Sequence, residues 1–175
     1  MVCLSKLKVL LVTSVIVFSI ILMIVAASLQ NTISPSPKND SNFNLLFRYG
    51  VGAKNELNTF EGTYTKDMVL DPPITIKLTL SDAELEQIRQ KMVEIGFFDY
   101  PENFPLRTDF WVTPRTDYYI KVENGSSVKE VSWNSNSMLE NNVQDNLLQL
   151  VDLIRSVVEQ KPEYKALPPA RGGYL

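Results

Sequence analysis

The sequence has no histidine and a single cysteine, Cys3, among its 175 residues. The absence of histidine excludes Ser-His-Asp and Cys-His catalytic systems, histidine ligands for a metal, and pH sensing by an imidazole. One thiol cannot form an internal disulfide. We therefore expect no metal site and no cofactor, and carboxylates are the only catalytic groups left to consider.

Positive charge is also scarce, with 17 lysines and arginines against 20 acidic residues. Lys6 and Lys8 are the only charged residues among the first 30, so positions 31–175 hold 15 basic and 20 acidic residues, a balance of −5. Each contact with a phosphate needs its own lysine or arginine. This balance therefore predicts that the protein does not bind nucleic acid.

One long apolar run stands near the N-terminus, where the 21 residues from Val9 to Leu29 carry no charge. At 1.5 Å per residue, a helix over this run spans about 30 Å, the thickness of the hydrocarbon core of a bilayer. Lys6 and Lys8 precede the run, and the next basic residue is Lys38. The positive-inside rule therefore places the N-terminus in the cytoplasm.

The apolar run divides the chain into four parts. We expect a cytoplasmic N-terminus at 1–8, a transmembrane signal anchor at 9–29, a polar and proline-containing linker at 30–42, and an extracytoplasmic domain at 43–175. The alternative is a secreted protein, because Val25-Ala26-Ala27 offers small residues to a signal peptidase. We prefer the anchor, since the run already has 16 residues before Val25, which is longer than an ordinary signal core.

Patterns of apolar residues predict an α+β domain. Apolar residues with a period of two indicate strands, which are expected at 43–51, 58–69, 74–80, 118–123 and 128–133. Apolar residues at helical spacing indicate two helices, which are expected at 82–95 and from about 138 to 158. This order predicts one antiparallel sheet of about five strands with two helices packed on one face. Capping boxes at Ser81 with Glu84 and at Ser137 with Glu140 are expected to begin the helices, and Gly96 to end the first.

The turn between the last two strands has two possible positions, Asn124-Gly125 and Gly125-Ser126. The first would place Ile120 opposite Lys129, whereas the second places it opposite Val131. Because the second register pairs apolar with apolar side chains, we predict a type II′ turn in which Gly125 is the first central residue.

Residues 99–117 form a proline-containing loop with little periodicity, and long loops of this kind are often functional. Phe104, Phe110 and Trp111 stand near Arg107 and Arg115, and together they can form an aromatic shelf with cationic rims that stacks a ring and holds a carboxylate. The residues expected to bind are Arg107, Phe110, Trp111 and Arg115. The alternative is that the aromatic side chains only close the open end of the sheet and that the arginines are solvated.

Asp99 with Glu102, or Asp67 with Asp71, are the acidic pairs that a glycosidase-type mechanism would need. No motif singles out either pair, and no calcium-binding loop pattern is present in the sequence. We therefore expect no catalytic residue and a protein that is not an enzyme.

The C-terminal stretch 161–175 contains prolines and glycines that cannot continue a helix, yet it keeps Tyr164, Leu167, Tyr174 and Leu175. A disordered tail has few aromatic residues. The pattern predicts a strap that buries Tyr164 and Leu167. Tyr174 and Leu175 are then either free for a partner that captures chain ends or part of the same packing.

Three segments, at 62–68 (GTYTKDM), 92–101 (MVEIGFFDYP) and 162–175 (PEYKALPPARGGYL), together resemble a family of uncharacterised exported or membrane-anchored prokaryotic proteins with no assigned activity. The resemblance covers residues 43–175. It implies a bacterial or archaeal envelope protein, and it transfers no catalytic or binding residue.

Together, these observations favour a membrane-tethered extracytoplasmic domain that binds a protein, peptide or envelope component without catalysis. The alternatives are a carboxylate-dependent hydrolase acting on envelope polymers and, if the signal is cleaved, a secreted inhibitor.

Overall fold

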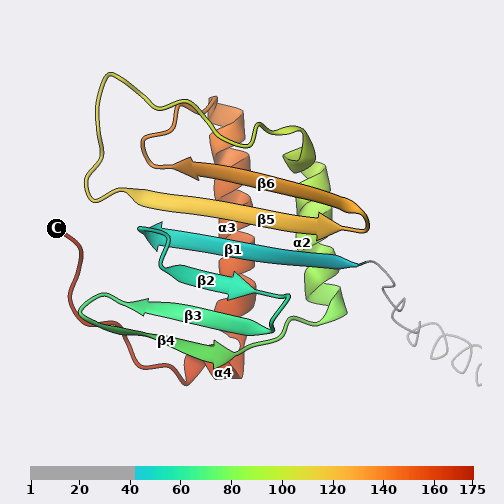
Figure 1. Ribbon diagram of the computed structural model, residues 1–175, viewed down its shortest axis with the longest axis vertical. Coiled ribbons are helices and arrows are strands. Elements are labelled where there is room, and N and C mark those ends of the chain that lie inside the picture. Colours follow the sequence, from blue (N-terminus) through green and yellow to red (C-terminus); the bar gives the residue numbers. More distant parts are fainter. Residues whose placement is uncertain (1–41) are drawn as a thin grey trace, which may run out of the picture. The chain divides into compact units, whose positions relative to one another are not determined.

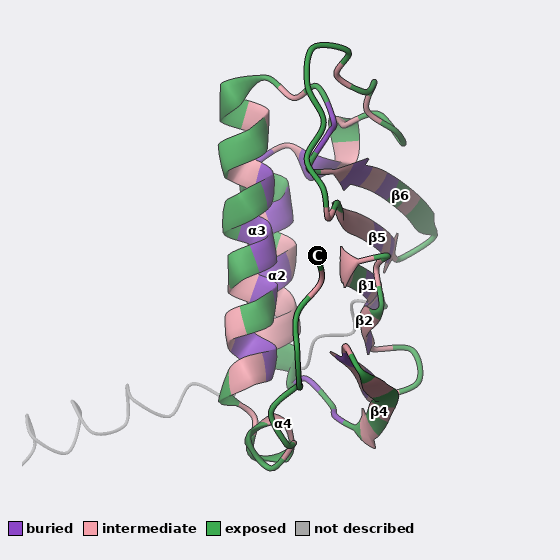
Figure 2. Cartoon of the chain, turned by 90° about the vertical axis from the view of Figure 1, so that its left-hand side faces the viewer, coloured by how far each residue is buried: buried purple, intermediate pink, exposed green. Residues whose placement is uncertain are grey.

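The computed structural model describes residues 42–175, which form one layer of strands and one layer of helices (Figures 1 and 2). The six strands form one sheet in the order β4-β3-β2-β1-β5-β6, with every neighbouring pair antiparallel. Along the chain the elements are β1 (Phe43–Val51), β2 (Asn55–Asn58), β3 (Thr63–Met68), β4 (Asp71–Lys77), α2 (Asp82–Glu94), the 3₁₀ helix η1 (Phe97–Asp99), β5 (Thr116–Asn124), β6 (Ser127–Asn134), α3 (Asn141–Gln160) and α4 (Pro162–Lys165).

The anchor predicted at 9–29 and all but the last residue of the linker predicted at 30–42 lie outside the described residues. Within residues 42–175, none of the helices combines the length and the apolar character that a bilayer crossing requires.

The α+β class is confirmed, and α2 and α3 lie on the same face of the sheet (Figure 2). The sheet has six strands rather than about five, because the short strand β2 was not expected. The strand expected over 58–69 corresponds to β3, which begins only at Thr63. Asn58 Oδ1 accepts hydrogen bonds from the backbone N–H groups of Phe60 and Glu61, at 3.1 and 3.2 Å. Gly62 then adopts a φ of +64°, which favours glycine, so the chain reverses at this point.

The first strand-and-helix unit forms as predicted around Ser81. The Ser81 hydroxyl accepts a hydrogen bond from the N–H of Glu84, and the Glu84 carboxylate accepts one from the N–H of Ser81 at 2.7 Å. Gly96 has a φ of +68° directly after the helix. β4 ends at Lys77, earlier than predicted, but Leu78 and Leu80 continue its alternation and are buried.

The hairpin of β5 and β6 has the predicted register. Ile120 lies opposite Val131, and Tyr118 lies opposite Trp133. Gly125 occupies the first central position of the turn with a φ of +63°, the left-handed conformation that the type II′ turn requires there.

The capping box predicted at Ser137 and Glu140 is wrong. α3 begins at Asn141, and its N-cap residue Glu140 makes no side-chain hydrogen bond to the helix. The Ser137 hydroxyl instead accepts a hydrogen bond from the N–H of Asn134 at 2.9 Å, which makes this segment a turn after β6.

The hydrophobic core fills the space between the inner face of the sheet and the two helices. The helices contribute residues at helical spacing, and the strands contribute alternate residues. The large side chains that are fully buried are Tyr64, Phe47, Phe97, Leu45, Leu57, Leu78, Ile88, Met92, Ile120, Leu147, Leu150 and Ile154. No helix from the described residues 42–175 lies on the outer face of the sheet (Figure 2).

Both edges of the sheet have features that limit pairing with a further strand. On β4, Pro72 and Pro73 are exposed and have no N–H to donate. Along β6, the N–H of Ser132 donates to the carbonyl of Glu102 at 2.7 Å, and Asn103 forms a bridge with the same strand. Each edge is therefore partly blocked as a template for another chain.

The C-terminal tail packs against the domain as the strap prediction requires, although Tyr164 and Leu167 are only partly buried. The ring of Tyr164 lies edge-on to the buried Tyr64, with 5.5 Å between the centroids, and Leu167 packs against the core. Lys66 Nζ donates to the carbonyl of Pro168 at 2.8 Å. Tyr64 and Lys66 both belong to β3, so the first part of the tail follows this strand (Figure 2).

The last residues of the tail divide into a bound part and a free part. Arg171 forms an ion pair with Asp71. The Tyr174 hydroxyl donates to Asp67 and accepts a hydrogen bond from Lys54 Nζ at 2.9 Å, so this residue belongs to the packing. Leu175 is fully exposed.

Candidate functional site

The loop between η1 and β5 is attached to the turn that joins β6 to α3. The N–H of Arg107 donates to the carbonyl of Asn136 at 2.8 Å, and the N–H of Met138 donates to the carbonyl of Pro105 at 2.7 Å. The side chain of Asn136, which is only 2% exposed, accepts from the N–H of Val112 and donates to its carbonyl, at 2.6 and 3.2 Å. These bonds fix the loop above the first turns of α3.

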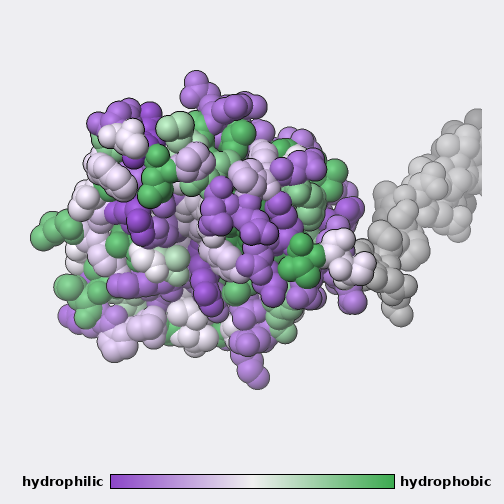
Figure 3. Space-filling view, turned by 45° about the horizontal axis from the view of Figure 1, so that its top comes forward, coloured by the Kyte–Doolittle hydropathy of each residue, from purple (hydrophilic) through white to green (hydrophobic). Residues whose placement is uncertain are grey.

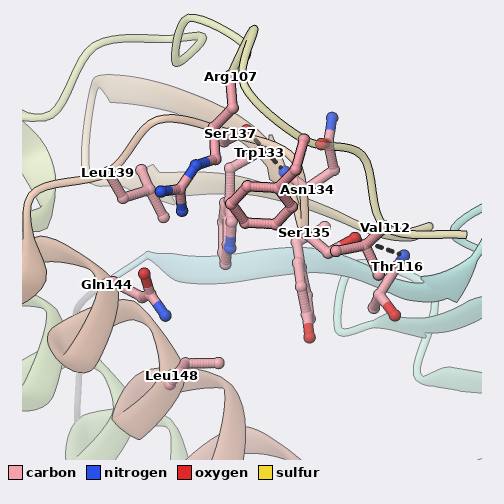
Figure 4. Close-up of a pocket in the computed structure, with 12 residues that line it drawn as sticks. Arg107, Val112, Thr116, Trp133, Asn134, Ser135, Ser137, Leu139, Gln144 and Leu148 are labelled. Atoms are coloured by element: carbon pink, nitrogen blue, oxygen red, sulfur yellow. Dashed lines mark hydrogen bonds between the residues drawn. The ribbon is translucent and has the colours of Figure 1, made fainter.

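A pocket of about 310 Å³ lies between this loop, the sheet and the start of α3 (Figure 4). Tyr118 and Trp133 stack on neighbouring strands, with ring centroids 4.9 Å apart, and form one wall. Leu139 and Leu148 contribute from the α3 side. The loop contributes Arg107, whose guanidinium group reaches toward Leu139 in Figure 4, together with Phe110 and Val112.

Arg107 is the only charged residue among the described residues that line the pocket. Its Cζ atom lies 4.4 Å from the ring centroid of Phe110, and its Nε atom lies 3.5 Å from Asp109 Oδ1. Burial raises the pKa of the Tyr118 hydroxyl, so this wall stays neutral. The pocket therefore offers one positive charge among apolar and neutral polar groups.

The structure brings together two of the four predicted site residues. Arg107 and Phe110 line the pocket. Trp111 is 60% exposed and lies next to the pocket in the chain, whereas Arg115 pairs with Asp117 at 2.7 Å. Of the aromatic side chains in the loop, Phe104 packs on the core, whereas Phe110 and Trp111 remain exposed. The alternative that these aromatic side chains only close the end of the sheet therefore holds for Phe104 alone.

Sequence reasoning did not find Trp133, Leu139 and Asn136 as site residues. Trp133 fits the alternating pattern of a strand residue that faces the core. Leu139 fits the helical spacing of the apolar residues predicted from about 138. No sequence signal identifies Asn136, which lies in a run of serines and asparagines. Its role depends on the loop that folds over it.

Exposed apolar side chains gather around the pocket. Figure 3 turns the β6 side of the molecule toward the viewer and shows hydrophobic groups separated by hydrophilic ones. Six exposed apolar residues belong to the loop, the turn before α3 or its first turns: Leu106, Phe110, Trp111, Val112, Met138 and Leu148. Large contiguous apolar patches are typical of interaction sites, whereas apolar side chains that are exposed singly are ordinary, so these residues add to the case for a site only through their position beside the pocket.

A second hollow, of about 420 Å³, shares Tyr118, Trp133, Asn134 and Ser137 with the pocket. Phe104 and Leu106 line it from the loop, and Tyr119 lines it from the outer face of β5. Asp117 also lines it, and Arg115 is the partner of this carboxylate.

In one candidate acidic pair, Asp67 with Asp71, both carboxylates are already engaged by other groups. Asp71 is bound to Arg171, whose hydrogen bond holds the pKa of this carboxyl below its ordinary value, whereas a general acid needs a raised pKa. Asp67 accepts from Tyr174 and from the N–H of Val69. Within residues 42–175, no group of three or more acidic or cysteine residues is placed to hold a metal ion.

Comparison with known proteins gives no relative from which a function can be transferred. No model of a protein family matches the chain, and no curated protein matches it either.

Proposed function

We propose that the protein is a membrane-tethered extracytoplasmic binding domain that is not an enzyme, and that it holds part of a protein, a peptide or an envelope component in the pocket beside Arg107 and Phe110. The observation that carries the proposal is the pocket itself. It combines one cation with two stacked aromatic rings and several apolar side chains. Such a mixture, with few polar groups on mainly apolar walls, is common in ligand sites.

The position of the pocket suits a tethered protein. β1 starts at Phe43, directly after the predicted linker, and its last residue, Val51, pairs with Thr116 in the wall of the pocket. At about 3.3 Å per residue, the strand separates these two ends by about 26 Å. The pocket therefore lies at the end of the sheet opposite to the start of the domain.

The membrane part of the proposal has its own test. We expect the full-length chain, with the residues from 1 to 29 intact, to stay in the membrane fraction after a high-salt wash, because the predicted anchor remains on the mature protein. Intact mass and fractionation measure this. A mature protein that starts at Ser28 and washes free of membranes would replace the anchor with the secreted alternative.

Site-specific photo-crosslinking in native membranes tests the binding function. A benzoylphenylalanine residue at position 111, beside the pocket, should give an adduct with a partner. The matched control is position 128, because Val128 is 57% exposed but belongs to the other end of the β5–β6 hairpin. Adducts at 111 that disappear in Phe110→Ala support the proposal. Equal adducts at both positions, or none at 111, would refute it.

A further inference from the structure

We propose that the ligand in the Arg107 pocket is the carboxyl-terminal residue of a peptide chain that ends in an apolar side chain. The inference rests on the proposed binding function and specifies the chemistry of its ligand.

The charge of the pocket selects an anion. The described residues 42–175 carry 14 basic and 19 acidic residues, so this part of the chain has a net charge of −5. The pocket differs, because its described lining residues include Arg107 and no acid. Among the described residues, no hydrogen bond of the Arg107 guanidinium group is formed, and its contact with Asp109 is a long one of 3.5 Å. The guanidinium fork is therefore available for a carboxylate.

Because Arg107 lies among aromatic rings, a ligand that fills the pocket needs an apolar group close to its negative charge. Its Cζ atom is 4.4 Å from the centre of the Phe110 ring, and the stacked rings of Tyr118 and Trp133 belong to the same pocket. A C-terminal residue meets both conditions, since its carboxylate and its side chain share one Cα. An internal aspartate or glutamate uses its side chain for the charge and has no apolar group left.

The size and polar groups of the pocket fit one residue of a peptide. A volume of about 310 Å³ is at the lower end of the range of about 300–1,000 Å³ for small-ligand pockets, so it suits one large side chain with its carboxylate. Gln144, Ser135 and Asn134 supply side-chain donors and acceptors for the last peptide unit. In Figure 4 the Gln144 amide faces the open space below Arg107.

Titration calorimetry of the full chain in lipid nanodiscs tests the assignment with three probes. These are N-acetyl-Gly-Gly-Phe with a free carboxylate, the same peptide as a C-terminal amide, and 3-phenylpropanoate, which keeps the carboxylate and the ring but has no peptide group. We expect the free acid to bind at least tenfold more tightly than either of the others, because only the free acid gives both the charge-assisted hydrogen bonds and the peptide contacts. Equal affinity for the acid and the amide would overturn the assignment. If 3-phenylpropanoate bound as tightly as the free-acid peptide, the assignment to a peptide C-terminus would also be overturned. The pocket would then recognise small organic acids.

Two arginines of the same loop provide a matched pair of variants. Arg107→Gln should lower the affinity for the free acid to that for the amide. Arg115→Gln should leave both affinities unchanged, because Arg115 pairs with Asp117 and is not a lining residue. An equal loss in both variants would refute the role of Arg107. The probe comparison on the unaltered chain does not depend on the folding of any variant. If no probe binds although position 111 gives specific adducts, the C-terminal assignment is wrong and the proposed binding function stands.

Discussion

Removing the C-terminal tail should destabilise the domain, although the tail contains no long helix and no strand. The change is a deletion of residues 163–175 from the full chain. It removes two apolar contacts, those of Tyr164 and Leu167, and the ring contact with Tyr64. The deletion also removes polar contacts, namely the ion pair of Arg171 with Asp71 and the hydrogen bonds of Pro168 and Tyr174. Most of them are solvent-exposed and contribute little.

The size of the effect follows from burial. Full burial of a large apolar side chain contributes about 1.5–3 kcal/mol, so the partial burial of Tyr164 and Leu167 contributes about 1 kcal/mol each. The edge-on pair of Tyr164 and Tyr64 adds about 1 kcal/mol. The deletion should therefore lower the free energy of unfolding by about 3 kcal/mol. For a domain of this length, that corresponds to a fall in melting temperature of about 10 °C.

Circular dichroism of the detergent-solubilised chain, during heating and in urea, measures the change. Tyr164→Ala alone should give about two thirds of the effect. Deletion of only Leu175 is the control and should change nothing, since this side chain makes no buried contact. An unchanged melting temperature after the longer deletion would show that the tail is not part of the fold.

Three further predictions concern local features. Ser81→Ala should cost about 1 kcal/mol in urea unfolding because the N-cap hydrogen bond is lost, whereas Ser81→Thr should cost much less. Gly125→Ala should cost about 1–2 kcal/mol in the same assay through backbone strain alone, since no atom lies within 4 Å of an added Cβ. Partial burial acts to raise the pKa of Glu84, but hydrogen bonds from Lys161 and Ser81 outweigh it and lower this pKa. The carboxylate therefore contributes stability above its unfolded pKa that is lost as the pH falls through its folded pKa. Glu84→Gln should accordingly reduce the loss of stability below about pH 4.5, measured by urea unfolding at several pH values.

The sequence predicts the elements whose signals are local and periodic. The alternation along β1, the capping box at Ser81 and the register around Gly125 depend on residues close together in the chain, and all three are present in the structure. Two predictions failed where a nearby polar side chain competes for the backbone. Asn58 holds a turn at the start of the strand predicted over 58–69, and Ser137 accepts a hydrogen bond from the N–H of Asn134 before the helix begins.

The candidate site was predictable only in part for a different reason. Arg107 and Phe110 belong to one unusual loop, so composition alone draws attention to them. The part of the pocket formed by β6, the turn after it and α3 lies more than 20 residues away in sequence, and Leu139 and Trp133 carry ordinary core patterns. Arg107 lines the pocket, whereas Arg115 does not and forms an ion pair with Asp117. The spacing of the two arginines in the sequence does not predict which of them Asp117 binds.

The protected edges of the sheet affect how copies of this protein can meet. If the proposed anchor is retained, many copies share a thin layer beside the bilayer, where two-dimensional confinement makes encounters frequent. Unprotected edge strands of neighbouring copies would then pair through backbone hydrogen bonds and join their sheets. The prolines of β4 and the loop segment along β6 oppose this kind of association. Contacts between neighbouring copies are therefore left to side chains on the outer face or the loop, which can separate again without breaking a backbone ladder.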